Sequence, residues 1–171
     1  MALLDQRTAH RAGQMGTWVL LGYRLPREPS TPRITVWRKL KRLGVVQLSD
    51  GMVALPADAR TREQLEWIAE EVTEAGGDAS IWLSQPATHG QERELARRMA
   101  DARAEEYTAV TAEAAAHAGA KDRRRVADRL RAELRRIDRR DYFPPPERDT
   151  AHAAVRALHE AAVRADEEVR P

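Results

Sequence analysis

The first apolar segment of the chain has the pattern of a buried strand followed by an amphipathic helix. Residues 18–21 are hydrophobic at consecutive positions and the run continues to Tyr23, as in a central strand that is covered on both faces. A proline-rich segment ends this run. Ser30 or Thr31 can then cap a helix whose first turn accepts Pro32 and which ends at Gly44.

The next segment predicts a hairpin and a second helix. Asp50 and Gly51 form a two-residue turn between strands at 45–48 and 52–55. A helix is expected to open at Thr61, with its apolar side chains at helical spacing on one face. Those inward-facing positions are Leu65, Ile68, Ala69, Val72 and Ala75.

A fourth strand completes a recognisable order of elements. Gly76 and Gly77 end the second helix, and residues 79–83 supply an apolar strand. The order β-α-β-β-α-β favours a four-stranded antiparallel sheet with both helices on one side. The predicted fold class is therefore α+β, with a ferredoxin-like unit followed by an antiparallel helical extension. The C-terminal helices or a second copy are expected to cover the other face of the sheet.

After Pro86 the pattern is helical and rich in Ala, Arg and Glu. Helices are expected at about 92–117, 122–140 and 147–168, and short connections favour antiparallel neighbours. The middle helix carries one apolar stripe, which consists of Val126, Leu130, Leu134 and Ile137. The organisation that follows is a flexible tail at 1–16, the ferredoxin-like unit at 17–86 and a helical region at 91–169. The helical region would pack on the sheet unit or on a partner subunit.

Composition restricts the class of protein. With 171 residues and one third of them charged, the chain can form a medium-sized domain with a modest core. It has no cysteine, so disulfides, thiolate metal sites and cysteine redox chemistry are excluded. No window approaches the roughly 18 apolar residues of a membrane span, and the first residues do not form a secretory signal. A cytoplasmic location and no membrane partner are expected.

The charges are unevenly distributed, although the net charge is only +2. Residues 23–42 carry a net charge of +6, residues 58–78 of −5, and residues 121–140 of +6. Basic segments are typical of nucleic-acid contacts. The alternative is that the acidic helix lies beside the basic elements and neutralises them.

Two basic helix faces are the candidates for binding DNA. In the helix after Pro32, arginine and lysine lie opposite the apolar positions, where several phosphates could be reached. In the helix at 122–140, most arginines lie opposite the apolar stripe, but they could equally pair with carboxylates of a neighbouring helix. The DNA-binding candidates are Arg33, Arg38, Lys39, Lys41, Arg42, Arg124, Arg125, Arg131, Arg135 and Arg139.

A smaller group of arginines suggests an oxyanion site. Arg24, Arg27 and Arg33 surround the expected start of the first helix. Guanidinium groups and a helix N-terminus suit a tetrahedral dianion such as chromate, sulfate or phosphate. The alternative is that these side chains face water. Trp67 lies off the apolar stripe of its helix and predicts a contact with the C-terminal helices or a second subunit; the alternative is a lone surface tryptophan.

Little in the sequence supports catalysis. His152 and His159 stack on one predicted helix, but no third ligand lies nearby in sequence, so no metal site, cofactor or catalytic residue is predicted. Phosphate-binding glycine loops and nucleophile elbows are absent. The protein is therefore not expected to be an enzyme.

Several motifs together resemble the N-terminal domain of ChrB, the family of chromate-resistance regulators. They are LPREPS, VWRKLKRLG, the Asp-Gly hairpin and RRDYFPPPER, in that order, and the resemblance extends from about Trp18 to about Ala162. The β-α-β-β-α-β half is also distantly similar to the middle domain of PaaX-type repressors and to the small CRISPR-associated integration subunit. Full-length ChrB proteins carry a second, C-terminal domain, and the resemblance does not extend to it.

The resemblance implies a cytoplasmic, DNA-binding, chromate-responsive transcriptional regulator, with DNA as partner and chromate or another oxyanion as possible effector. A homodimer is expected. One alternative is a non-enzymatic accessory or scaffold protein of a chromate-resistance locus that does not bind DNA. A weaker alternative is a metal-dependent nuclease. Nuclease relatives of this half-fold hold a metal with Asp at the end of the first strand, where this chain has Arg24.

Overall fold

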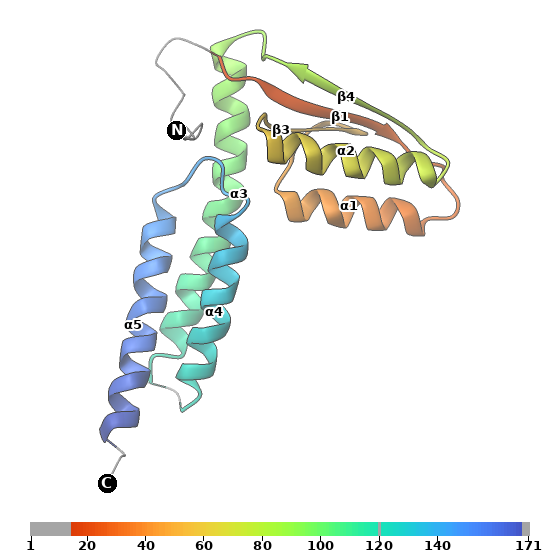
Figure 1. The fold of residues 1–171 in the computed structure, drawn as a ribbon. Coiled ribbons are helices and arrows are strands. Elements are labelled where there is room, and N and C mark those ends of the chain that lie inside the picture. The colour runs from red at the N-terminus through yellow and green to blue at the C-terminus, as the bar shows by residue number, and fades with distance from the viewer. Residues whose placement is uncertain (1–14, 120, 169–171) are drawn as a thin grey trace, which may run out of the picture. The chain divides into compact units, whose positions relative to one another are not determined.

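The structure is a computed structural model that describes residues 15–119 and 121–168 (Figure 1). The expected tail at 1–16 lies almost entirely outside the described residues. The elements, in chain order, are β1 (Trp18–Arg24), α1 (Thr31–Leu43), β2 (Val46–Ser49), β3 (Met52–Pro56), α2 (Ala59–Glu74), β4 (Asp78–Ser84), α3 (His89–Ala116), α4 (Arg123–Asp138) and α5 (Glu147–Glu168).

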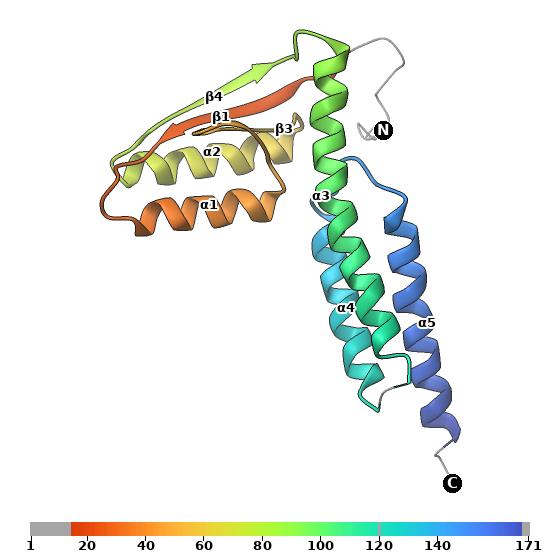
Figure 2. The same cartoon turned by 180° about the vertical axis from the view of Figure 1, so that it is seen from behind.

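The four strands form one antiparallel sheet in the order β2-β3-β1-β4. β1 lies in the centre, and its Leu21 pairs with Val53 of β3 and Ile81 of β4. Both α1 and α2 cover the same side of this sheet (Figures 1 and 2). The predicted ferredoxin-like unit and its helical extension are confirmed.

The core of this unit lies between the sheet and the two helices. Alternate residues of a strand point to one face, so Val19 and Leu21 of β1 share a face with Val53 and Leu55 of β3. All four are buried. The helices contribute Val36, Leu40, Leu65, Ile68 and Val72 to the core. The opposite face of the sheet carries Trp82, whose side chain is 61% exposed.

Helix ends account for two details that the sequence left open. Ser30 occupies the N-cap position of α1, but its side chain makes no capping hydrogen bond. α2 begins at Ala59, two residues before the expected Thr61, because Asp58 is the N-cap. The Thr61 N–H donates to Asp58 Oδ1 at 2.7 Å and the Asp58 N–H donates to Thr61 Oγ1 at 2.9 Å. Thr61 is therefore a buried part of the first turn.

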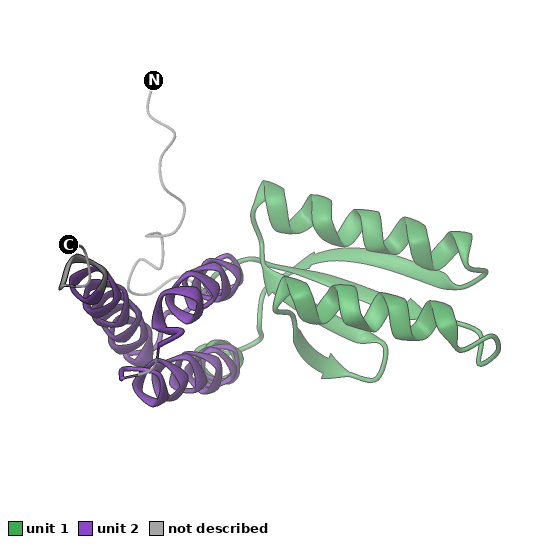
Figure 3. Ribbon diagram, turned by 90° about the horizontal axis from the view of Figure 1, so that it is seen from below, with its two compact units in different colours: residues 1–96 green, residues 97–171 purple. Residues whose placement is uncertain are grey.

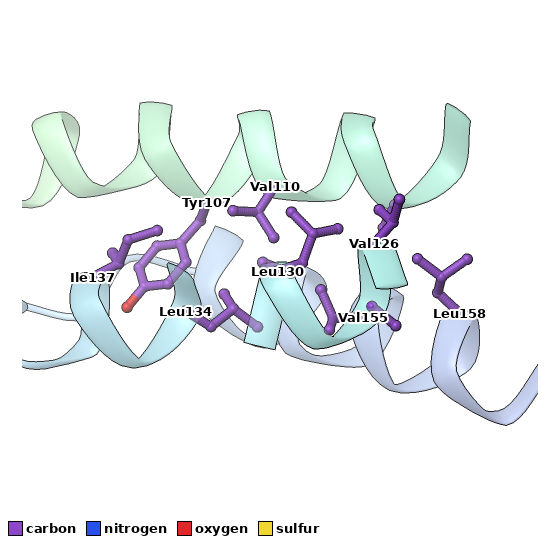
Figure 4. Packing of buried hydrophobic residues seen from close by; sticks show 11 residues of the cluster. Tyr107, Val110, Val126, Leu130, Leu134, Ile137, Val155 and Leu158 are labelled. Carbon is purple, nitrogen blue, oxygen red and sulfur yellow. The ribbon is translucent and has the colours of Figure 1, made fainter. Parts of the chain in front are cut away.

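The chain divides into two compact units, residues 1–96 and 97–171, and the chain passes from one to the other within α3 (Figure 3). In the second unit, α4 and α5 pack on the rest of α3 (Figure 4). The predicted stripe of α4 is buried, as are Tyr107 and Val110 of α3 and Val155 and Leu158 of α5. The apolar periodicity of α4 thus identified the centre of this core.

Candidate functional site

The outer face of α1 presents the basic side chains of the first unit. Val36 and Leu40 point into the core, and Arg38 and Arg42 are exposed one turn apart on the other side of the helix. Lys41 Nζ lies 5.5 Å from the centre of the Trp37 ring, a cation–π contact. This face can therefore present several cations to an extended anion.

Lys39 differs from its neighbours on α1. Its Nζ donates to Glu71 Oε1 of α2 at 2.5 Å, so this lysine is engaged by the acidic helix. The adjacent Arg38 points about 100° further round the helix, away from α2. Among the α1 candidates, Lys39 is thus the one that is neutralised within the unit.

The segment before α1 holds the three arginines of the expected oxyanion site. Arg24 ends β1 opposite Asp78 of β4 in the strand register, and Arg27 is exposed in the loop. Arg33 is exposed in the first turn of α1, where its NH1 donates to the Arg27 carbonyl at 3.2 Å. Arg27 and Arg33 are therefore brought together. Arg24 lies at the end of the inner strand β1, opposite Asp78.

Many arginines of residues 123–140 are exposed, and several of them form ion pairs with carboxylates. Arg124, Arg135 and Arg139 are exposed. More than half of the arginines in residues 123–140 pair with carboxylates of the same unit. Those pairs are Arg125–Asp122, Arg129–Glu113, Arg131–Asp128, Arg136–Glu133 and Arg140–Glu106. Three of these pairs join residues one turn apart on α4 or at its N-cap. Solvent reaches these pairs, so each contributes little to stability and its arginine can change partners.

The second unit contains a partly buried polar cluster that sequence reasoning missed. The Tyr107 hydroxyl of α3 lies 2.9 Å from Asp138 Oδ1 at the end of α4 and 2.9 Å from Asp141 Oδ2 in the following loop. Arg148 Nε donates to Asp138 Oδ1 at 3.2 Å, and His152 Nε2 lies 3.1 Å from the same oxygen. Three helices are thus joined through one tyrosine and one aspartate.

A second part of this cluster lies beside the first. Arg103 NH2 donates to Glu106 Oε1 at 2.9 Å, and Arg140 NH1 donates to the same oxygen at 3.0 Å. The Arg103 side chain is only 10% exposed, and burial lowers its pKa although Glu106 opposes that shift. Among the described residues, Arg103 Nε and Asp141 Oδ1 are buried without a hydrogen-bond partner.

The two aspartates of the cluster have opposite shifts in pKa. Burial alone would raise the pKa of Asp138, but hydrogen bonds from His152, Tyr107 and Arg148 outweigh it and lower the pKa. Burial raises the pKa of Asp141, whose side chain is 2% exposed, and its hydrogen bond with Tyr107 does not offset this. Tyr107 itself has a raised pKa because it is buried beside these carboxyl groups.

The described residues give no geometry for metal catalysis. Residues 15–119 and 121–168 contain no group of three or more His, Cys, Asp or Glu side chains that could hold a metal ion. His152 is committed to Asp138, and the buried His159 Nδ1 has no partner among the described residues. In the same part of the chain, no helix is long and apolar enough to cross a bilayer.

Comparison with known proteins gives the family. The family described as "Protein ChrB, N-terminal" matches residues 33–126, which is more than half of the chain. The chain belongs to the ChrB N-terminal family. Protein ChrB of Cupriavidus metallidurans is 31% identical over 138 residues, which cover 74% of this chain and 40% of that relative. The chain thus corresponds to less than half of the relative's length. No solved structure matches it.

The family assignment agrees with the resemblance, and the structure explains one of its motifs. RRDYFPPPER spans residues 139–148, which are the connection between α4 and α5 and the first two residues of α5. Its Arg140, Asp141 and Arg148 all turn into the polar cluster around Tyr107. The signal available in the sequence was a charged, proline-rich connection between two amphipathic helices. The partners on α3 lie more than 30 positions earlier and give no local signal.

Proposed function

We propose that this chain is a DNA-binding regulatory module of the ChrB type that acts in chromate resistance. The observation that carries the proposal is the outer face of α1, where Arg38, Lys41 and Arg42 are exposed together. Cations on one helix face can contact consecutive phosphates, and phosphate contacts provide most of the affinity of such proteins. Membership in the ChrB family supports the regulatory role. We assign it no enzymatic activity.

The exposed arginines of α4 provide a second basic face. This face carries Arg124, Arg135 and Arg139. The ion pairs of Arg125 and Arg131 with residues one turn away are open to solvent, so phosphates can replace the carboxylates in them. This face is proposed to contribute non-specific affinity. Readout of base sequence is not assigned to either helix.

The test is the salt dependence of DNA binding by matched variants. Fluorescence anisotropy with duplex DNA flanking the chain's own gene is measured at about 50 and 200 mM salt, where phosphate binding falls steeply. Arg38→Ala/Arg42→Ala should weaken binding and reduce the salt slope by about 2, roughly one per lost phosphate contact. The control is Arg62→Ala, an exposed arginine of acidic α2 that pairs with Glu66. No binding at low salt, or equal effects of both variants, would refute the proposal.

A second candidate function is that of an accessory protein that does not bind DNA. The favouring observation is that more than half of the arginines in residues 123–140 already pair with carboxylates. In that case the arginines stabilise the second unit through their ion pairs, and the protein does not bind DNA. The same titration distinguishes the two functions, because an accessory protein would show no salt-dependent DNA affinity in any variant.

A further inference from the structure

The helix layer of the first unit carries opposite charges on two neighbouring helices. On α1, the exposed residues Ile34, Arg38, Lys41 and Arg42 recur at three- and four-residue spacing, so they form one outer stripe. On α2, Glu63, Trp67, Glu70 and Glu74 form the corresponding outer stripe. α1 and α2 lie side by side (Figures 1 and 3), so one surface is basic along one half and acidic along the other.

Each stripe also contains one large exposed apolar side chain. Ile34 is 48% exposed and Trp67 is 56% exposed, and each is flanked by the charges of its own helix. An exposed aromatic side chain in the middle of a charged helix is a typical anchor of a protein interface. The layer therefore combines apolar anchors with charges of both signs, which is what a self-complementary surface requires.

We infer that two copies of this chain pair through this layer, with α1 of each copy on α2 of the other. β1 and β3 are antiparallel and each is followed by a returning helix, so α1 and α2 are antiparallel as well. A two-fold axis parallel to the helices places α1 on the partner's α2 and creates two identical contacts between opposite charges. A two-fold axis across the helices would place α1 on the partner's α1, where the arginines repel one another.

The contact within one copy shows that these two helices can pair by charge. Lys39 of α1 forms a hydrogen-bonded ion pair with Glu71 of α2 within the same copy. Arg38 and Arg42 lie on the outer side of the same helix, where the acidic stripe of a second copy would provide equivalent partners. The Trp67 side chain would then pack on the partner's α1 stripe, which carries an apolar side chain and arginines for stacking.

One consequence rests on the proposed function. The dimer covers Arg38 and Arg42, so DNA and the second copy compete for the same guanidinium groups. In the dimer, the acidic α2 of the partner copy lies where the phosphate backbone would otherwise bind. DNA is therefore expected to shift the chain toward the monomer. The dimer itself is tested without DNA, so a failure of DNA binding leaves this test unaffected.

The test is a charge swap measured by sedimentation velocity of the full chain at low salt. Arg38→Glu/Arg42→Glu makes both stripes acidic, and Glu63→Arg/Glu70→Arg makes both basic. Each variant alone should raise the dimer dissociation constant by at least about tenfold, because like charges then face each other. A one-to-one mixture of the two variants should form a mixed dimer, and the chain that carries all four changes should dimerise again.

Two tryptophan variants locate the interface independently of charge. Trp67→Ala should weaken the dimer, whereas Trp82→Ala, which removes a similarly exposed side chain from the opposite face of the sheet, should not. Circular dichroism checks that each variant is folded. A wild-type chain that stays monomeric, charge variants that remain dimeric, or dissociation by Trp82→Ala and not by Trp67→Ala would each overturn the inference.

Discussion

Asp138 Oδ1 and Asp141 Oδ2 each lie 2.9 Å from the same hydroxyl oxygen, that of Tyr107. A phenol has one proton, so it can donate to only one of them. The lowered pKa of Asp138 reflects stabilisation of its ionised carboxylate as an acceptor, whereas burial raises the pKa of Asp141. One hydroxyl thus links the loop after α4 and the end of α4 to α3.

Removing this hydroxyl should destabilise the helical unit. Tyr107→Phe removes a hydrogen bond from the buried Asp141 carboxyl, which costs about 1–3 kcal/mol, whereas Asp138 keeps Arg148 and His152 as partners. Urea unfolding followed by far-UV circular dichroism measures the loss. Tyr23→Phe, in β1 of the other unit, is the matched control and should change the unfolding free energy by less than about 0.5 kcal/mol. Equal effects of the two variants would contradict the role given to the Tyr107 hydroxyl.

The two aspartates predict opposite pH dependences. The folded pKa of Asp138 lies below its unfolded value, so its stabilisation is present near neutral pH and is lost as pH falls through the folded pKa. Asp138→Asn should therefore be most destabilising near neutral pH and least at a pH below the folded pKa of Asp138, where the carboxyl is protonated in both states.

Asp141 has the opposite sign, because its folded pKa lies above its unfolded value. Its contribution to stability is present at acid pH and is lost as pH rises through the folded pKa. Asp141→Asn cannot ionise, so its unfolding free energy relative to wild type should rise from pH 3 toward pH 7. Urea titrations across that range measure both variants, and parallel curves for the two would contradict the assignment.

Two glycines of the first unit separate the cost of a left-handed backbone conformation from the cost of a steric clash. Gly51 in the β2–β3 turn has φ of 72°, and a Cβ there would lie 2.5 Å from the Tyr23 carbonyl oxygen. Gly76 after α2 has φ of 79°, and a Cβ there meets nothing within 4 Å. Gly76→Ala should cost about 1–2 kcal/mol for the left-handed conformation alone.

Gly51→Ala should cost at least about 1 kcal/mol more, because the added methyl group must displace the backbone of β1. The measurement is urea unfolding followed by tryptophan fluorescence, since all four tryptophans lie within residues 18–82. The prediction fails if the two alanine variants are equally stable.

The loop before α1 provides a test of oxyanion response. Arg27 and Arg33 are in contact through the Arg33 side chain, and both are exposed beside the proposed DNA face. A dianion held there would neutralise charge that the phosphates need, so chromate or sulfate should release DNA. Arg27→Ala or Arg33→Ala should weaken both ligands together, measured by anisotropy of labelled DNA with and without chromate. A variant that kept full DNA affinity but lost the chromate response would require a separate sensing site.

The order of elements was readable from the sequence because its signals are local. The apolar run of β1, the Asp-Gly turn, the terminal Gly44 and the stripe of Leu130 and its neighbours each act within a few residues, and each gave the element that the structure shows. The start of α2 at Ala59 was missed because its N-cap Asp58 and Thr61 at N3 hydrogen-bond to each other, a pair outside the usual capping-box residues.

Only the tertiary structure decided which charges are available. Lys39 and Arg38 are equivalent in sequence, yet Lys39 is bound by Glu71, which lies 32 positions later. Likewise, Asp138 and Asp141 meet Tyr107 across 31 and 34 positions. The spacing of apolar residues along the sequence shows which side of a helix will be buried, because burial of that side stabilises the fold. The partner of a polar side chain depends on which element packs beside it, and that follows only from the complete fold.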